Sequence, residues 1–163
     1  GSMFSPYEGS LRVPFLIRYS GKIPARQVSN DIVHLVDLFP TLANFVGGDI
    51  PQDRILDGVD QSGFFSGTSA KSSRESMVIY VGNELFGVKW RNWKMILKHV
   101  EGDSDGYSIK SMAYPSYYNL LIDPKEEEPE KFYLDDTWVD VPLWQVVEDH
   151  QASIEKDAGA PGP

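Results

Sequence analysis

The pattern of apolar and polar positions divides the chain into two parts of different character. Residues 13–19 (Val-Pro-Phe-Leu-Ile-Arg-Tyr) are almost continuously apolar, which predicts a strand covered on both faces inside a parallel or mixed sheet. A chain of this length rarely covers both faces of a strand so near its N-terminus. We therefore expect further residues of the natural protein upstream. We also expect an open strand edge at 13–19 that would either pair with another copy of the chain or be disordered.

A second apolar run, Ile32–Val36, predicts another short strand, and a helix is expected to follow it from residue 37 to residue 46. Asp37 is a suitable N-cap for this helix. Pro40 then lies in the first helical turn, where its missing N–H costs little. The small polar stretch 68–73 predicts a linker between two structural parts.

After this linker, apolar and polar residues alternate, which predicts antiparallel strands. We expect a three-strand meander, a long mobile loop, a fourth strand, a solvated acidic turn and a closing helix that begins near Pro142. The predicted ranges are 77–81, 85–90 and 93–100 for the meander, 101–116 for the loop, 117–122 for the fourth strand and 125–131 for the acidic turn.

Together these elements predict an α+β fold in two parts. Residues 4–70 are assigned to the remnant of a larger α/β domain, with two strands, a helix and a loop. Residues 71–157 are assigned to a small four-stranded antiparallel sheet with a C-terminal helix. Residues 1–3 (Gly-Ser-Met) have the character of a cleaved expression tag, and residues 158–163 are expected to form a disordered tail.

The composition excludes several classes of function. The net charge of −9 and the pI near 4.7 argue against nucleic acid or an anionic membrane surface as a partner. No apolar run approaches the ~20 residues that a membrane-spanning helix needs. The sequence contains no cysteine, so the chain has no disulfide, thiolate metal site or cysteine nucleophile.

Several motifs, in order along the chain, resemble those of the arylsulfatase family. Residues 7–14 (Tyr-Glu-Gly-Ser-Leu-Arg-Val-Pro), with residues 21–25, are similar to the family's Tyr-Glu-Gly-Gly-x-Arg-Val-Pro … Pro-Gly-x-Ile-Pro-Ala block. Further similar segments are Asp-Leu-Phe-Pro-Thr-Leu at 37–42, Leu-Asp-Gly-Val-Asp at 56–60 and Tyr-Asn-Leu at 118–120. Any one of these motifs alone would be a weak signal, but their common order makes the resemblance specific.

This resemblance implies the C-terminal part of an alkaline-phosphatase-like sulfatase fold. The intact enzyme is expected to hydrolyse a sulfate ester of a small molecule or carbohydrate, using a formylglycine nucleophile and a calcium ion. In the family, the nucleophile motif and the metal carboxylates lie upstream of the segment matched here. We therefore expect no catalytic residue, metal ligand or cofactor in this chain, and a missing N-terminal catalytic part as its partner. Members of the family are usually periplasmic, secreted or lysosomal.

Four residues are candidates for substrate binding. The resemblance suggests Glu8 and Arg12, because the family places this segment close to its sulfate pocket; the alternative is that both fix the local turn by hydrogen bonds. Asn83 and Glu84 lie in a predicted hairpin turn that would reach over a neighbouring active site. The hypothesis is an inert chain that forms one wall of a substrate cleft. The alternative is a free-standing binding or scaffold module without catalysis.

Other polar and aromatic residues fit structural roles better than chemical ones. His34 has apolar neighbours and is expected to be packed and hydrogen-bonded, while His99 and His150 are expected on the surface. Three aspartates at 53, 57 and 60 suit caps and turns, because they lack the spacing of an EF-hand loop. Aromatic residues at strand positions are expected to lie in the core or to form cross-strand pairs, with stacking on a carbohydrate or aryl group as the alternative. The set considered is Trp90, Trp93, Tyr107, Tyr114, Tyr117 and Tyr118, together with Lys94.

Overall fold

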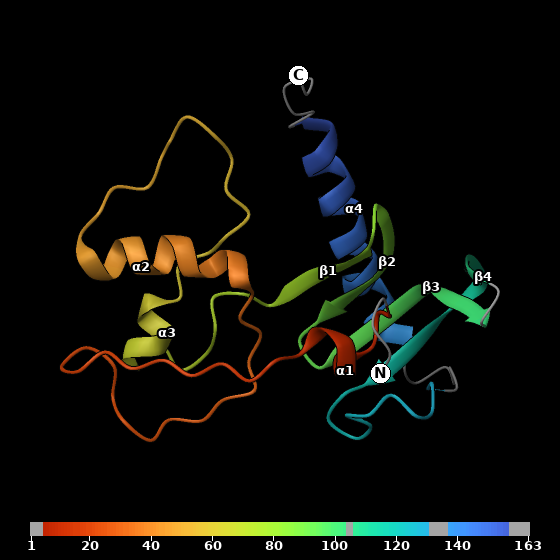
Figure 1. Ribbon diagram of the computed structural model, residues 1–163, viewed down its shortest axis with the longest axis horizontal. Helices are drawn as coiled ribbons and strands as arrows, with labels where there is room; N and C mark the ends of the chain where they lie inside the picture. Colours follow the sequence, from red (N-terminus) through yellow and green to blue (C-terminus); the bar gives the residue numbers. More distant parts are fainter. Residues whose placement is uncertain (1–4, 104–105, 131–136, 157–163) are drawn as a thin grey trace. The chain divides into compact units, whose positions relative to one another are not determined.

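The computed structural model describes residues 5–103, 106–130 and 137–156 and separates the chain into two compact units (Figure 1). Unit 1 comprises Gly1–Val13 and Ser76–Pro163, and unit 2 comprises Pro14–Glu75. The division between Glu75 and Ser76 follows the predicted linker, and the residues before Pro14 group with the sheet. The predicted tag remnant at 1–3 and the predicted tail at 158–163 lie outside the described residues.

Unit 1 contains a four-stranded antiparallel sheet with the strand order β1-β2-β3-β4. Two-residue turns join the first three strands, so the predicted meander is confirmed. Gly82 adopts a φ of 61° in the first of these turns, a backbone conformation that suits glycine in a tight hairpin. The strands are β1 (Ser76–Val81), β2 (Glu84–Trp90), β3 (Trp93–Asp103) and β4 (Gly106–Asn119).

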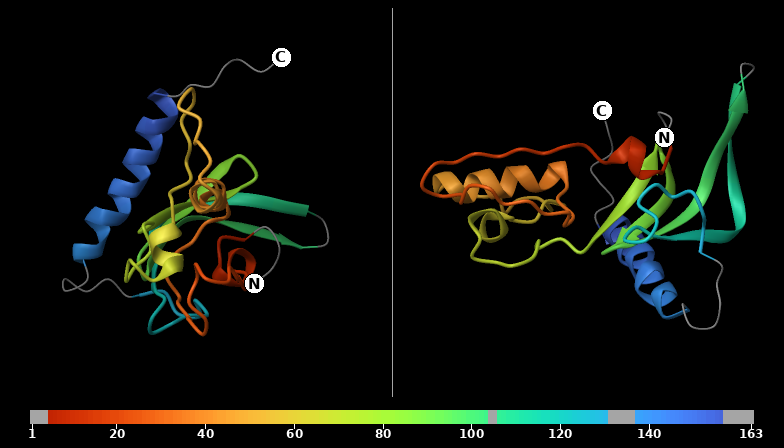
Figure 2. Two further views of the ribbon diagram at one scale, coloured as in Figure 1. Left: turned by 90° about the vertical axis from the view of Figure 1, so that its left-hand side faces the viewer. Right: turned by 90° about the horizontal axis from the view of Figure 1, so that it is seen from below.

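The long loop predicted at 101–116 is wrong, because β3 and β4 continue through it as a hairpin (Figure 2). Glu101 lies opposite Ser108 in this hairpin. β2 pairs with β3 only as far as Ile96, so the outer part of the hairpin has two strands and no third strand to cover it. Polar residues are tolerated on both faces of such a ribbon, which hid the strands in the sequence. The fourth strand also ends at Asn119, earlier than predicted.

Helix α4 (Asp140–Lys156) packs on one face of this sheet (Figure 2). It follows the 3-10 helix η2 (Thr137–Val139), and Pro142 lies in its first turn as predicted. Leu143 and Val147 are one helical turn apart and both face the strands. The buried core consists of Val88, Met95, Tyr117, Val139, Leu143 and Val147. Within the described ranges, no helix combines the length and apolarity needed to cross a membrane.

Unit 2 contains the 3-10 helix η1 (Leu35–Asp37), helix α2 (Leu38–Val46) and helix α3 (Ser62–Ser66). The helix predicted after Asp37 is confirmed, and Gly47 ends it with a φ of 70°. The strands predicted at 13–19 and 32–36 are wrong. Self-association through residues 13–19 stays a prediction. A strand requires a neighbouring strand for its hydrogen bonds, and no residue of 14–75 forms one.

The buried carboxylate of Asp37 connects three segments of unit 2. It accepts hydrogen bonds from the Arg74 guanidinium, with Nε at 2.9 Å and Nη2 at 2.5 Å, and from the backbone N–H groups of His34 and Val59, both at 2.9 Å. Burial alone raises the pKa of Asp37, but these donors outweigh burial and lower the pKa. The start of α2, the loop before α3 and the segment after α3 are therefore held by one side chain.

Candidate functional site

Four charged side chains form a closed network on the sheet face opposite α4. Glu8 begins α1 (Glu8–Leu11), Lys89 lies on β2, Lys94 lies on β3 and Glu126 lies in the loop after β4. Lys94 Nζ lies 2.7 Å from Glu8 Oε1 and 2.6 Å from Glu126 Oε1, and Lys89 Nζ lies 3.0 Å from Glu8 Oε2. We call these four residues the charge network.

The position of the two lysines follows from the strand register. Side chains alternate between the faces of a strand, and Val88 and Met95 point into the core. Lys89 and Lys94 therefore point to the opposite face, and they are paired directly across β2 and β3. Like charges in this arrangement destabilise a sheet. The Glu8 carboxylate removes this repulsion by placing one oxygen against each lysine.

The network is removed from water at its centre. The side chain of Lys94 is fully buried, and that of Glu126 is 1% exposed. Burial alone raises the pKa of Glu8, but hydrogen bonds and charge from Lys94, followed by those from Lys89, outweigh burial and lower the pKa. Charges buried in this way require partners, because an unpaired buried charge is strongly destabilising.

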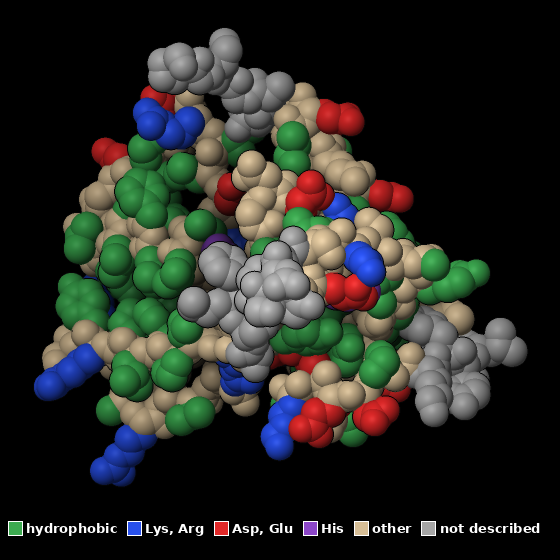
Figure 3. Space-filling model, turned by 45° about the vertical axis from the view of Figure 1, so that its right-hand side comes forward, with side chains coloured by type: hydrophobic (Ala, Val, Ile, Leu, Met, Phe, Trp, Pro, Cys, Tyr) green, Lys and Arg blue, Asp and Glu red, His purple; other side chains and the backbone are tan. Residues whose placement is uncertain are grey.

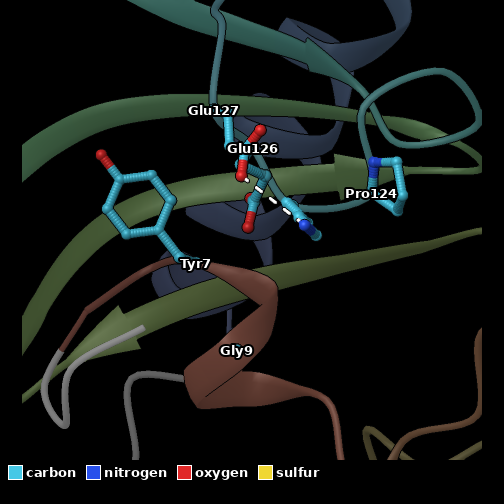
Figure 4. Close-up of a pocket in the computed structure, with 6 residues that line it drawn as sticks. Tyr7, Gly9, Pro124, Glu126 and Glu127 are labelled. Atoms are coloured by element: carbon cyan, nitrogen blue, oxygen red, sulfur yellow. Dashed lines mark ion pairs between the residues drawn. The ribbon is translucent and has the colours of Figure 1, made fainter.

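A pocket of about 470 Å³ adjoins the network (Figure 4). Tyr7 and Gly9 line one side, and residues 124–127 (Pro-Lys-Glu-Glu) line the other. Glu126 belongs both to the pocket wall and to the charge network. Lys125 and Glu127 are exposed and approach each other at 3.8 Å. Lys94 thus contacts Glu126 of one pocket wall and Glu8, which lies between Tyr7 and Gly9 of the other.

The predicted substrate-binding residues occupy two places in unit 1. Glu8 is part of the charge network, and Arg12 ends α1 with its backbone N–H donating to the Glu8 carbonyl at 2.8 Å. Asn83 and Glu84 lie at the exposed β1–β2 turn, where Glu84 pairs with Lys98 at 2.5 Å. The structure thus joins Glu8 to two lysines and a glutamate, and joins Glu84 to a lysine of β3.

Sequence reasoning missed Lys89 and Glu126 as site residues and considered Lys94 only with the aromatic residues. The predicted solvated turn at 125–131 is wrong for Glu126, which is 7% exposed. The segment Asp123-Pro124-Lys125-Glu126 could have indicated Glu126, because it places a carboxylate a few residues after the end of β4. The charges of Lys89 and Lys94 predicted that both side chains are exposed to water. No local sequence pattern indicates that a distant segment covers them.

The remaining candidates have structural roles. His34 is half-exposed and caps η1 through Nδ1, which accepts from the Val36 N–H at 3.3 Å. His99 contacts Glu101 at 2.8 Å, and His150 bonds the Tyr80 hydroxyl at 2.8 Å.

The three aspartates have separate partners in unit 2. Asp60 accepts from the Ser62 N–H at the start of α3, Asp53 pairs with Arg54, and the Asp57 carbonyl accepts from Arg74. Among the residues that the structure describes, no group of three or more histidine, aspartate or glutamate side chains is placed to hold a metal.

Several strand aromatics pack against aromatic rings outside the sheet, and Tyr117 lies in the core. Trp90 and Trp93 are cross-strand partners, and both contact the Trp138 ring edge-on at centroid distances of 6.2 and 6.1 Å. Tyr118 packs edge-on against Tyr7 at 6.3 Å. The cross-strand pairing predicted for the two tryptophans is confirmed. Tyr114 is instead 84% exposed, and the side chain of Tyr107 lies outside the described residues.

The fold defines the class of protein first. The structure aligns with a crystal structure of the PsFucS1 sulfatase from Pseudoalteromonas sp. with a TM-score of 0.76 and 22% identity, over 88% of this chain and 30% of that chain. The four-stranded antiparallel sheet and covering helix of this chain therefore have the α+β fold of the C-terminal region of a sulfatase, as predicted.

The sequence profile of the family described as N-sulphoglucosamine sulphohydrolase, C-terminal, matches residues 4–138. The chain belongs to this family. Human arylsulfatase D is 30% identical over 149 residues, which cover 79% of this chain and 25% of the relative. Human steryl-sulfatase is 34% identical over 90 residues, which cover 55% of this chain and 15% of the relative. The chain thus spans a quarter or less of the length of these two relatives, and the predicted resemblance to arylsulfatases is confirmed.

Proposed function

We propose that this chain is a structural part of a sulfuric ester hydrolase and forms one wall of its substrate cleft. The sulfated substrate would be a small molecule or a carbohydrate. In this proposal the catalytic groups are supplied by a part of the same protein that precedes the matched segment in the longer relatives. The chain by itself is inert.

The observation that carries the proposal is the apolar surface of unit 2 (Figure 3). Leu16 is 95% exposed, Val28 is 94% exposed and Val46 is 77% exposed. Further large apolar side chains of the same unit are open to water: Phe15, Leu35, Phe39, Leu42 and Ile55. Soluble monomers rarely expose large apolar patches unless these bind a partner. Covering a fully exposed side chain of this kind stabilises by roughly 1.5–3 kcal/mol, and a half-exposed one by less. A second protein surface is therefore expected to cover unit 2.

The sequence does not fit a formylglycine site, and the described residues do not fit a calcium site. A formylglycine requires a Cys- or Ser-x-Pro-Ser/Ala-Arg segment, and the sequence contains none. The described residues also offer no cluster of metal-binding side chains. Enzymes lower reaction barriers by roughly 8–23 kcal/mol, whereas one positioned acid or base contributes about 10²- to 10⁴-fold in rate. The charged groups of this chain are consequently assigned roles in shaping the cleft.

The proposal is tested by measuring turnover of a chromogenic aryl sulfate in the presence of calcium. This chain is compared with the longest open reading frame that contains it. Turnover by the longer protein alone is the expected result, and replacing its motif nucleophile with alanine provides the control. Turnover by this chain alone would overturn the proposed inert role. A longer protein that binds sulfated sugars without hydrolysing them would instead favour the scaffold alternative.

A further inference from the structure

We infer that Lys94 and Glu126 are positioning residues. They hold segment 5–12 in the position it needs as part of the wall of the substrate cleft. This inference rests on the proposed function for its catalytic consequence, and on the charge network for its geometry. Lys94 Nζ contacts Glu8, Glu126 and the carbonyl oxygen of Pro6, the last at 3.0 Å. An ammonium group has three hydrogens to donate. All three therefore have acceptors, and two of these acceptors belong to segment 5–12.

The backbone of Glu126 gives independent support. Its φ of 58° lies in the left-handed region, which is uncommon for residues other than glycine and costs free energy. A turn alone would favour glycine or asparagine at this position. The glutamate carboxylate contributes what those residues lack: Oε1 binds Lys94, and Oε2 accepts from the Glu8 backbone N–H at 2.5 Å. The loop after β4 is thus bonded directly to the first residue of α1.

This arrangement changes the role assigned to Glu8. Both of its carboxylate oxygens contact lysines within the network, so Glu8 orients the segment and does not read the substrate. The neighbouring Tyr7 lines the pocket (Figure 4), and Arg12 is exposed at the end of α1. Tyr7 is the side chain of this segment that lines the pocket, so holding the segment in place also holds this part of the pocket wall.

Hydrogen exchange tests the positioning role in this chain without any assay of activity. The reporting amides are those of Glu8, Ser10, Leu11 and Arg12, which donate within the segment or to Glu126. Lys94→Met leaves the buried Glu126 carboxylate without its cation and leaves Glu8 with Lys89 alone. We expect exchange of these amides to accelerate on the order of 100-fold, while β2 stays protected. Lys110→Met, which removes an exposed partner of Glu101 on β4, is the matched control.

Glu126→Gln is the second variant and serves if Lys94→Met fails to fold. It removes the charge of residue 126 but keeps the shape of the side chain. The inference predicts faster exchange at the Glu8 amide in this variant as well. Unchanged exchange of the four amides in a folded Lys94→Met or Glu126→Gln protein would overturn it.

Kinetics of the longer protein separate positioning from simple loss of folded enzyme. A positioning role predicts that Glu126→Gln raises KM for the aryl sulfate by on the order of tenfold or more, whereas a purely structural role lowers only the amount of active protein. Unchanged KM together with faster exchange would overturn the link to the substrate cleft. Absence of turnover in the unsubstituted longer protein would refute the proposed function, and the exchange result would still decide whether Lys94 and Glu126 hold the segment.

Discussion

Replacing Asp37 with asparagine tests whether one carboxylate holds unit 2 together. In the Asp37→Asn protein, an NH₂ group replaces one of two oxygens that accept from Arg74, His34 and Val59. The NH₂ group is a donor and faces the N–H groups of Arg74, His34 or Val59, which are also donors. At least one hydrogen bond to residue 37 is therefore replaced by a repulsive contact between two donors. The Arg74 side chain, which is 15% exposed, also loses its counter-charge.

The expected cost follows from this burial. Breaking a buried ion pair by removing one partner costs about 3–5 kcal/mol, and a typical domain is stable by about 5–15 kcal/mol. The substitution therefore removes a large fraction of the stability of unit 2. Since about 1.4 kcal/mol corresponds to a factor of ten, amides that exchange through opening of this unit are expected to exchange roughly 10²- to 10³-fold faster or more.

The location of the tryptophans separates the two units in the assay. All four tryptophans of the sequence, at 90, 93, 138 and 144, belong to unit 1. Tryptophan fluorescence during urea unfolding therefore reports unit 1, while exchange at the Val59 and Gln61 amides reports unit 2. We expect the fluorescence transition to stay in place while these two amides exchange faster.

Asp53→Asn provides the control for this experiment. It removes an ion pair from the same unit, but Asp53 and Arg54 have side chains that are 67% and 64% exposed. No measurable change in exchange is expected, because exposed pairs are hydrated and screened. An Asp37→Asn protein that exchanges like the Asp53→Asn protein would refute the reasoning, as would an equal shift of the fluorescence transition.

Three further predictions concern unit 1. Gly87→Ala would place a Cβ 2.3 Å from the Met95 carbonyl oxygen, so β2 and β3 must separate; we expect a loss of about 1–3 kcal/mol or more in thermal unfolding, and an unchanged midpoint would contradict the close packing. Burial raises the pKa of Glu8, but Lys94 and Lys89 outweigh burial and hold this pKa below 4.5. The ionised Glu8 therefore stabilises the fold above pH 4.5, and this contribution is lost as the pH falls through the lowered pKa of the folded state. Acid unfolding followed by fluorescence should lose part of its pH dependence in Glu8→Gln. Burial, followed by Tyr7 and nearby carboxylates, raises the pKa of Tyr118 from 10.0 to about 12; the neutral phenol stabilises the fold below pH 10, and this contribution should disappear between about pH 10 and pH 12 in unfolding experiments, but not in Tyr118→Phe.

The sequence predicted those elements whose hydrogen bonds are local or whose partners are close in the chain. Helix α2 has its proline and its final glycine within a short segment, although the Asp37 side chain makes no capping hydrogen bond to this helix and binds Arg74 instead. The strands β1, β2 and β3 follow one another through two-residue turns, so their alternation and their turn residues agree. α4 was recognisable from the spacing of Leu143 and Val147 after Pro142.

The failures share a different physical origin. The run at 13–19 is apolar enough for a buried strand, but hydropathy reports burial and not the presence of a pairing strand. In this chain it forms no strand, and Leu16 is 95% exposed. The prediction failed at the outer β3–β4 hairpin for the opposite reason. Its strands are paired but not covered by another layer, so many of their residues are polar and no regular alternation marks them.

The candidate site was predictable only in part, because its central charges come together from distant segments. Glu8 was found through the resemblance of its motif, but its partners are 81, 86 and 118 residues away along the chain. Lys94 occupies a strand position that normally points to water. Only the tertiary arrangement shows that Glu8 and Glu126 cover it.

The two faces of the sheet are held by different physical means, and this difference explains why the network is charged. The face under α4 is apolar, and its burial stabilises the domain without demanding one exact partner geometry. A buried ion network contributes little net stability compared with apolar residues of the same volume, but it is strongly destabilised when a partner is displaced. Lys94 accepts one arrangement of Pro6, Glu8 and Glu126 and penalises the others. The charged face therefore determines how segment 5–12 is seated, and the apolar face determines whether the sheet domain folds.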